Sequence, residues 1–173
     1  NLYVILKSLH FPPEFSFGDQ KLNALDETKL PIYTILCPLY REANVLSQFL
    51  DSIQKLDWPK NRLDVILLLE EDDKETIEAV SKSNLPKYVR SLVVPESLPK
   101  TKPKACNFGL SHAKGEYLVI YDAEDKPEPE QLKKAYLAFQ STPPNVVCLQ
   151  AKLNYYNPHQ NLLTRFFTAE YSL

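Results

Sequence analysis

The sequence predicts an α/β fold in which a doubly wound, mostly parallel sheet carries helices on both faces. Short apolar runs rich in β-branched residues alternate along the chain with stretches that have helical hydrophobic spacing. The apolar runs are hydrophobic on both faces, which is typical of strands buried in a parallel sheet. Parallel neighbours are joined by right-handed crossovers, so the intervening helices have to cover the sheet.

The first strand and helix follow a leader segment, residues 1–29, with little helical potential. Residues 32–37 are apolar on both faces and are predicted as a strand, which Pro38 is expected to end. Apolar side chains then recur at helical spacing from Asn44, a good N-cap residue, until Trp58. We therefore expect a helix after the first strand.

The remaining elements are assigned by the same criteria. Strands are predicted over residues 63–69, 89–94, 117–121 and 146–155, and helices over residues 76–82, 104–112 and 162–173. Another helix is expected to begin near Pro127 and Pro129, because proline suits the first turn, and to run through Phe139. The predicted order is βαβαβαβαβα.

Composition and charge exclude several classes of function. The chain has 173 residues, 44% of them hydrophobic, which suits one globular domain. A formal net charge of −2 gives no attraction to nucleic acid, so we expect no nucleic-acid partner. Three glycines leave no Gly-rich phosphate loop, and three cysteines without a C-x-x-C pair favour neither a disulfide framework nor structural zinc. No apolar run reaches the ~20 residues of a membrane span, so the chain as given is expected to be soluble.

Acidic residues follow the fourth predicted strand, in the sequence Asp122-Ala123-Glu124-Asp125. The carboxyl ends of parallel strands share one edge of the sheet, where such folds bind ligands. Carboxylate oxygens suit Mg²⁺ or Mn²⁺, and a divalent ion there could bridge the phosphates of a nucleotide. Alternatively, these acids only favour the N-terminus of the following helix.

A second acidic group, Glu70 to Asp73, follows the second predicted strand. Glu70 and Glu71 adjoin the apolar strand and are interpreted as acceptors for a nucleobase or ribose. Asp72 and Asp73 are interpreted as a solvated cap of the next helix.

Two lysines, Lys102 and Lys104, stand where a helix is predicted to begin. Their ammonium groups and the free N–H groups of a helix start could meet a diphosphate together, or the lysines could simply be solvated. The three histidines have neither ligand spacing nor a nucleophile elbow beside them, so a His-dependent hydrolase has no support.

Four short motifs follow one another along the chain: Cys37-Pro38-Leu39-Tyr40-Arg41-Glu42, Leu69-Glu70-Glu71-Asp72, Lys104-Ala105-Cys106-Asn107 and Tyr121-Asp122-Ala123-Glu124-Asp125. Together they resemble motifs of the nucleotide-binding half of family 2 glycosyltransferases with the GT-A fold, especially membrane-bound relatives of bacterial cellulose synthase. The resemblance implies that residues 30–173 are the nucleotide-sugar-binding part of such a domain, truncated before its acceptor-binding half. The chain departs from the family pattern where Glu replaces Asp beside the base, where Cys106 replaces Gly, and where Glu124 replaces the second Asp of D-x-D.

The resemblance implies a role for each matching residue. The implied nucleotide-sugar-binding residues are Pro38, Tyr40, Glu42, Glu70, Glu71, Lys104 and Asp122. Tyr40 and Glu42 would line the base and ribose pocket, and Lys104 would approach the diphosphate. Asp122 would hold ribose or metal, and Glu124 would coordinate Mg²⁺ or Mn²⁺, with Asp125 as the alternative ligand.

The implied reaction is an inverting, metal-assisted transfer of a sugar from a nucleoside-diphosphate sugar, with UDP-sugars favoured, to a saccharide or lipid acceptor. In that family the catalytic base and acceptor site lie downstream, so this chain alone is expected to contain no catalytic residue and to be inactive. The full-length protein is expected at the cytoplasmic face of the bacterial inner membrane, held there by C-terminal segments that follow Leu173.

Other functions remain open. A nucleotidyltransferase that makes the activated sugar also needs acids at strand ends, but it would carry a glycine- and basic-rich loop where residues 38–42 stand. A phospho-accepting receiver module would need its acidic pair after the first strand. A non-catalytic nucleotide-binding or interaction domain of the same fold is the third alternative.

Overall fold

The computed structural model describes residues 14–151. The strands are β1 (Tyr33–Leu39), β2 (Leu63–Glu70), β3 (Val89–Val94) and β4 (Tyr117–Ile120). The α-helices are α2 (Asp19–Asn23), α3 (Leu46–Gln54), α4 (Lys74–Lys82), α5 (Lys102–Leu110) and α6 (Gln131–Gln140). Short 3₁₀ turns cover Glu27–Lys29, Ala43–Val45 and Lys60–Arg62. The chain divides into two compact units, residues 1–137 and 138–173, and every described strand belongs to the first.

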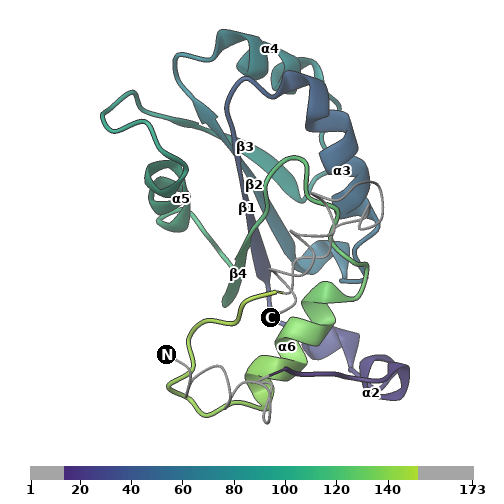
Figure 1. Cartoon of the computed structure of the whole chain (residues 1–173). Coiled ribbons are helices and arrows are strands. Elements are labelled where there is room, and N and C mark those ends of the chain that lie inside the picture. The colour runs from purple at the N-terminus through teal and green to yellow at the C-terminus, as the bar shows by residue number, and fades with distance from the viewer. Residues whose placement is uncertain (1–13, 152–173) are drawn as a thin grey trace, which may run out of the picture. The chain divides into compact units, whose positions relative to one another are not determined.

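The strands form one sheet in the order β3-β2-β1-β4, and every pairing is parallel (Figure 1). β1 pairs with β2 along its whole length, from Tyr33 opposite Leu63 to Leu39 opposite Leu69. On its other side, β1 pairs with β4 only as far as Leu36. The predicted parallel sheet is confirmed, and the strand order reverses at β1.

Helices cover both faces of this sheet, as predicted. Alternate residues of a strand point to opposite faces, so β1 directs Ile35, Cys37 and Leu39 towards one face and Leu36 towards the other. The first face packs against Phe49 and other α3 residues, with Val80 of α4 and Leu132 of α6 in the same cluster. Leu36 packs with α5 in a second cluster.

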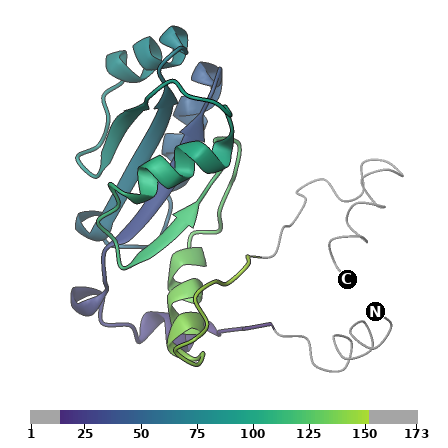
Figure 2. The ribbon, with the colours of Figure 1, turned by 90° about the vertical axis from the view of Figure 1, so that its left-hand side faces the viewer.

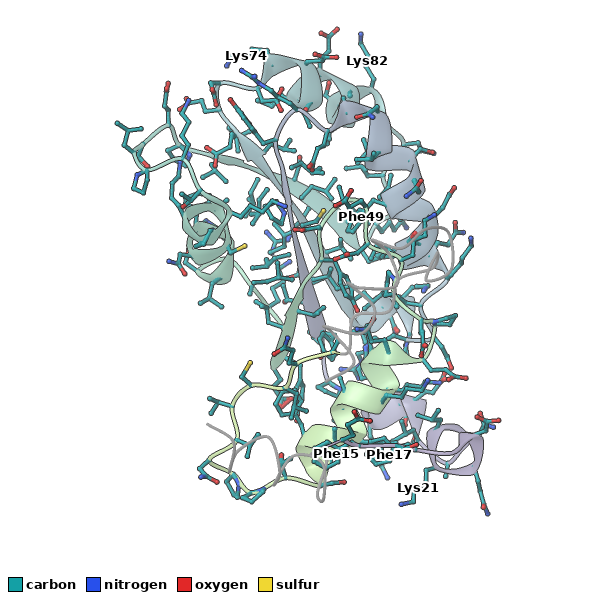
Figure 3. The ribbon with its side chains drawn as sticks, viewed as in Figure 1. Phe15, Phe17, Lys21, Phe49, Lys74 and Lys82 are labelled. Atoms are coloured by element: carbon teal, nitrogen blue, oxygen red, sulfur yellow. The ribbon has the colours of Figure 1, made fainter. Side chains whose placement is uncertain are left out.

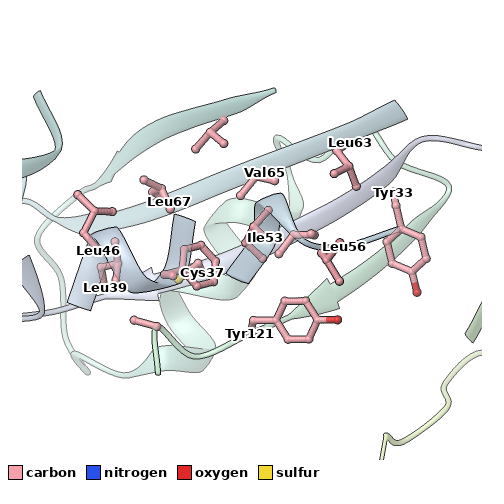
Figure 4. Packing of buried hydrophobic residues seen from close by; sticks show 14 of the residues in the cluster. Tyr33, Cys37, Leu39, Leu46, Ile53, Leu56, Leu63, Val65, Leu67 and Tyr121 are labelled. Atoms are coloured by element: carbon pink, nitrogen blue, oxygen red, sulfur yellow. The ribbon is translucent and has the colours of Figure 1, made fainter. Parts of the chain in front are cut away.

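The two layers are visible in the figures. α5 lies on one side of the sheet, whereas α3 and α4 lie on the other (Figures 1 and 2). In the larger cluster, Leu46 and Ile53 of α3 lie over Cys37, Leu39 and neighbouring residues of β2 (Figure 4). Each large side chain removed from water there contributes about 1.5–3 kcal/mol. The sheet is therefore a rigid support for the loops at its carboxyl edge.

Pro38 does not end the first strand, and this part of the sequence prediction is wrong. β1 continues through Pro38 to Leu39. The Leu36 carbonyl accepts a hydrogen bond from Tyr121 N on the β4 side, at 3.0 Å. Pro38, two residues later, faces that same side, where β4 has already ended at Ile120. Its missing N–H therefore costs no ladder hydrogen bond.

Other boundaries shift for local reasons. α4 begins two residues earlier than predicted because the Asp73 carboxylate accepts a hydrogen bond from Thr76 N and caps the helix. α5 begins at Lys102, with proline in its first turn, and ends at Leu110. The actual start of α6, Gln131, follows both predicted prolines.

The predicted fifth strand is wrong where the structure describes it. Residues 146–151 form no strand. Val146 N donates to the Pro143 carbonyl at 2.9 Å in a turn, and Val147 is 86% exposed instead of buried. Residues 152–155 of that strand and the helix predicted over residues 162–173 lie outside the described residues. Within residues 14–151, no helix has the length and apolar character needed to cross a membrane.

The leader is attached to the sheet domain. Lys133 of α6, with a side chain that is almost fully buried, bridges Glu27 at 2.9 Å and Asp57 at 2.8 Å. Nearer the N-terminus, Phe15 and Phe17 stack with ring centroids 6.3 Å apart (Figure 3). The described part of the leader, residues 14–29, is therefore more ordered than its sequence predicts, with α2 and a 3₁₀ turn.

Candidate functional site

A cavity of about 220 Å³ opens at the carboxyl edge of the sheet. We call it the edge cavity. Its lining residues come from the end of β1, the end of β2 and the start of α5: Pro38, Leu39, Tyr40, Glu42, Leu68, Glu70, Lys100, Thr101, Lys102 and Ala105. This volume is below the roughly 300–1,000 Å³ of a complete ligand pocket, so the edge cavity could enclose only part of a ligand. Its position, beside the strand where the order reverses, is where doubly wound sheets bind ligands.

The turn after β1 presents an exposed aromatic ring to this cavity. Tyr40 is 42% exposed and lines the edge cavity. The guanidinium carbon of Arg41 lies 5.1 Å from the centre of the Tyr40 ring. Arg41 has a φ of 58°, an uncommon conformation outside glycine, and its N–H donates to the Asp73 carboxylate. Asp73 therefore caps α4, as the sequence predicted, and also fixes the turn that carries Tyr40.

Glu42 is half-buried at the same edge. One of its carboxylate oxygens, Oε2, is buried and has no hydrogen-bond partner among the described residues. Burial raises the pKa of Glu42, and the charges of Asp122 and Glu124 raise it further, whereas Lys102 lowers it. Glu42 is thus a poorly satisfied acceptor that faces two other acids and one cation.

The first acid after β4, Asp122, pairs with the ammonium group of Lys102. The Lys102 Nζ lies 2.9 Å from Asp122 Oδ1. The hydrogen bond that Lys102 donates to Asp122, with the charges of Glu42 and Glu124, raises the pKa of Lys102 against the effect of its burial. Asp125 accepts a hydrogen bond from Asp122 N at 2.8 Å and so closes the turn with one of its carboxylate oxygens. Of the two alternative ligands, Glu124 is therefore the one whose carboxylate is not engaged in this turn.

The lysine implied to approach a diphosphate, Lys104, is engaged elsewhere. Its Nζ lies 3.1 Å from Glu70 Oε2, 3.1 Å from the Pro95 carbonyl and 3.3 Å from the Ser97 carbonyl. The Lys104 side chain is 18% exposed and that of Glu70 is 9% exposed. This largely buried ion pair joins the end of β2 to the start of α5.

The other acids after β2 also contact the loop that follows β3. The Glu71 carboxylate accepts a hydrogen bond from Glu96 N at 2.9 Å. Asp72 pairs with Lys100 at 2.7 Å, and so does not cap α4 as the sequence predicted. These contacts hold the loop and the first residues of α5 against the carboxyl edge.

Several predicted site residues thus lie together at the edge cavity, and others do not line it. Pro38, Tyr40, Glu42 and Glu70 line the edge cavity, and Lys102 connects it to Asp122. Glu71 and Lys104 are absent from the lining. Lys100 and Thr101 also line the cavity, and neither belongs to the four motifs of the sequence; the alternating lysines at the start of α5 were a usable signal for Lys100.

A divalent cation fits the chemistry of these acids. No group of three or more His, Cys, Asp or Glu side chains in residues 14–151 is arranged to hold a metal ion. However, Mg²⁺ at nucleotide sites usually takes one or two carboxylates and completes its shell with phosphate oxygens and water. Asp122 and Glu124 provide such carboxylates, the Lys102 ammonium occupies a cation position beside Asp122, and Glu42 Oε2 is an acceptor without a hydrogen-bond partner among the described residues.

The comparisons with known proteins agree with this architecture. The sequence profile described as "Glycosyl transferase family 2" matches residues 34–172. The chain is 30% identical over 171 residues to "Probable glucomannan 4-beta-mannosyltransferase 7" of Oryza sativa subsp. japonica, covering 92% of this chain and 29% of that protein. It is 26% identical over 144 residues to "Probable glycosyltransferase YdaM" of Bacillus subtilis (strain 168), covering 82% of this chain and 34% of that protein. The chain therefore spans about a third of the length of these relatives.

Solved structures show the same fold. "Mannosyltransferase PcManGT from Pyrobaculum calidifontis in complex with GDP-Man and Mn2+" superimposes with a TM-score of 0.64 and 26% identity, over 90% of this chain and 45% of that one. S. aureus TarS 1-349 in complex with UDP-GlcNAc gives a TM-score of 0.54 at 20% identity, over 70% of this chain and 37% of that one. The predicted fold class is confirmed, and with the profile matching most of its length the chain belongs to glycosyltransferase family 2.

Proposed function

We propose that this chain is the donor-binding part of an inverting, metal-assisted glycosyltransferase. Its ligand is a nucleoside-diphosphate sugar bound across the carboxyl edge of the sheet. The observation that carries the proposal is the meeting of Glu42, Lys102 and Asp122 beside the edge cavity in a chain of this family.

The nucleoside would occupy the edge cavity. The exposed ring of Tyr40 offers an aromatic face on which a base can stack. Pro38 forms part of the cavity wall, and Glu42 and Glu70 provide carboxylate acceptors for base or ribose groups. Glu71 lies next to Glu70 and would contact the base only after releasing Glu96 N.

The diphosphate would lie towards Lys102 and Asp122. Asp122 and Glu124 would hold Mg²⁺ or Mn²⁺, and the bound ion would neutralise the charge that develops on the leaving diphosphate. The N-terminus of α5, which begins at Lys102, favours an anion at the same place. Lys104 would act indirectly, because its contacts with Glu70 and the Pro95 carbonyl fix the start of α5.

The donor and the other parts of the reaction belong to the proposal. GDP-mannose is the donor present in one structural neighbour and UDP-GlcNAc in another, so both nucleotide classes are candidates for this chain. The acceptor would be a saccharide or lipid, and we assign no catalytic base to residues 14–151. The whole protein would act at the cytoplasmic face of a membrane.

Calorimetric titration tests the proposal. GDP-mannose and UDP-GlcNAc are titrated into the chain with and without Mn²⁺, and the titrations are repeated with Asp122→Asn and with Asp51→Asn, an exposed α3 residue, as the matched control. We expect metal-dependent binding of at least one donor that Asp122→Asn weakens about tenfold or more and Asp51→Asn leaves unchanged. A donor affinity that changes neither with Mn²⁺ nor with Asp122→Asn would favour a non-catalytic domain. GTP and UTP are titrated in parallel, and tighter binding of a triphosphate than of either nucleotide sugar would favour a nucleotidyltransferase.

A further inference from the structure

Three lysines, one just before α5 and two in its first turn, each face acidic partners, but one of them differs from the others. Lys100 pairs with Asp72 and Glu96, and Lys104 pairs with Glu70, so both are held by the loops around the cavity. Lys102 instead pairs with Asp122, and its side chain is 57% exposed. Its partner is the residue proposed to hold the metal.

The charges around Lys102 do not balance. One ammonium group faces the carboxylates of Asp122, Glu42 and Glu124. Glu42 Oε2 is also buried without a hydrogen-bond partner among the described residues. Three negative charges against one positive charge leave a site that a divalent cation would neutralise better than a single ammonium does.

We propose that Lys102 is an internal counter-ion that occupies the cation position in the metal-free protein and leaves it when the metal binds. The displaced ammonium group then contacts the diphosphate of the donor. This inference rests on the proposed function and assigns Lys102 a donor-binding role within it. No bond is made or broken in the exchange.

Two steps make up the exchange: Lys102 leaves Asp122 when the metal binds, and its ammonium group then reaches the bound nucleotide. An ammonium group hydrogen-bonded to Asp122 Oδ1 repels a divalent ion approaching the same oxygen, so one has to leave. The Lys102 side chain is flexible and exposed, and an exposed ion pair contributes at most about 1 kcal/mol, so its release is inexpensive. Lys102 already lines the edge cavity, which keeps the freed ammonium beside a bound nucleotide.

The exchange predicts effects of opposite sign on two affinities. Replacing Lys102 with glutamine removes the competitor, so Mn²⁺ alone should bind about fivefold more tightly. The same replacement removes a charge-assisted contact, so GDP or UDP at saturating Mn²⁺ should bind about tenfold more weakly. A lysine that was only a surface charge would change both affinities little, and one that only helped the fold would weaken both.

The test combines two measurements on the 173-residue chain. Binding of Mn²⁺ alone is followed by the loss of the free-ion electron paramagnetic resonance signal, and binding of GDP and UDP at saturating Mn²⁺ by calorimetry. The variants are Lys102→Gln, Lys102→Arg, which keeps the charge, and the control Lys82→Gln, which removes a lysine from an exposed pair with Glu78 on α4 (Figure 3). Thermal melting checks that all three variants are folded.

We expect Lys102→Gln to tighten Mn²⁺ binding and weaken nucleotide binding, Lys102→Arg to restore both values towards wild type, and Lys82→Gln to change neither. If the wild-type chain binds Mn²⁺ and nucleotide but Lys102→Gln moves both affinities in one direction, or moves neither, the exchange is refuted and the proposed function stands. If the wild-type chain binds neither Mn²⁺ nor nucleotide, the proposed function fails and the exchange fails with it.

Discussion

Replacement of Lys104 by glutamine separates a structural role from a ligand-binding role. The resemblance implies that this lysine approaches the diphosphate, whereas the structure has its Nζ within 3.3 Å of three acceptors, one of them the Glu70 carboxylate. Glutamine keeps most of the side-chain volume but removes the charge. Glu70, only 9% exposed, would then lose its cation.

The size of the effect follows from this burial. Removing one partner of a buried ion pair costs about 3–5 kcal/mol, because the remaining charge is left uncompensated. Lys104 keeps 18% exposure, so the lower end, about 3 kcal/mol, applies. For a chain of this length each kcal/mol shifts the melting temperature by about 2–4 °C, which gives a decrease of about 6–12 °C.

Differential scanning calorimetry measures this shift. Lys82→Gln is the control, because its pair with Glu78 is exposed on both sides and should contribute about 0.5 kcal/mol or less. Nucleotide binding is then measured at a temperature where the Lys104→Gln variant is fully folded. An unchanged melting temperature together with a large loss of nucleotide affinity would refute the structural role, and would mean that Lys104 leaves Glu70 to contact the diphosphate.

Three further predictions concern the scaffold. Burial raises the pKa of Asp64, but hydrogen bonds from Arg90 and other donors outweigh it and hold that pKa below its ordinary value. This carboxylate therefore stabilises the fold above pH ~4, and the stabilisation is lost as the pH falls through the folded-state pKa. In urea unfolding, Asp64→Asn should lose less of its free energy of unfolding between neutral and acidic pH than the wild type does. An unaltered pH profile would contradict this. Gly115→Ala would put a Cβ 2.5 Å from a β1 backbone nitrogen and should cost about 2 kcal/mol or more in the same assay, whereas a neutral result would mean that the turn relaxes freely. Burial raises the pKa of the Cys37 thiol far above its ordinary value, so Ellman's reagent at pH 8 should modify the exposed Cys148 quickly and Cys37 only after unfolding; equal rates would show that the core opens readily.

The sheet was predictable because its signals are local. β3 runs from Val89 to Val94 as expected, and β2 differs from its prediction by a single residue, since runs of apolar residues mark buried strands in the sequence. The end of β1 was not predictable. Whether Pro38 interrupts a strand depends on which side its nitrogen faces and on where β4 stops, and neither is encoded near Pro38.

The site was predictable as a set of loops but not as a set of contacts. The acids after β1, β2 and β4 were expected at one edge, and Glu42 and Asp122 do face the same lysine. The sequence pointed to Lys102 and Lys104 together as possible diphosphate contacts, and the resemblance implied Lys104. The choice depends on where α5 begins and on the Pro95 and Ser97 carbonyls, which hold Lys104 away from the cavity; these are tertiary contacts that no motif reports.

Mn²⁺ placed at the carboxyl edge together with a nucleotide is the claim on which the proposed function depends. Paramagnetic broadening of backbone amide signals, recorded with Mn²⁺ and GDP or UDP and compared with diamagnetic Mg²⁺, locates the ion directly. The amides of Glu42, Lys102 and Asp122 should disappear first, while that of Gly115, about 20 Å away at the other end of β4, should be affected much less. Broadening that is centred elsewhere, with or without the nucleotide, would contradict a shared site for metal and donor at this edge.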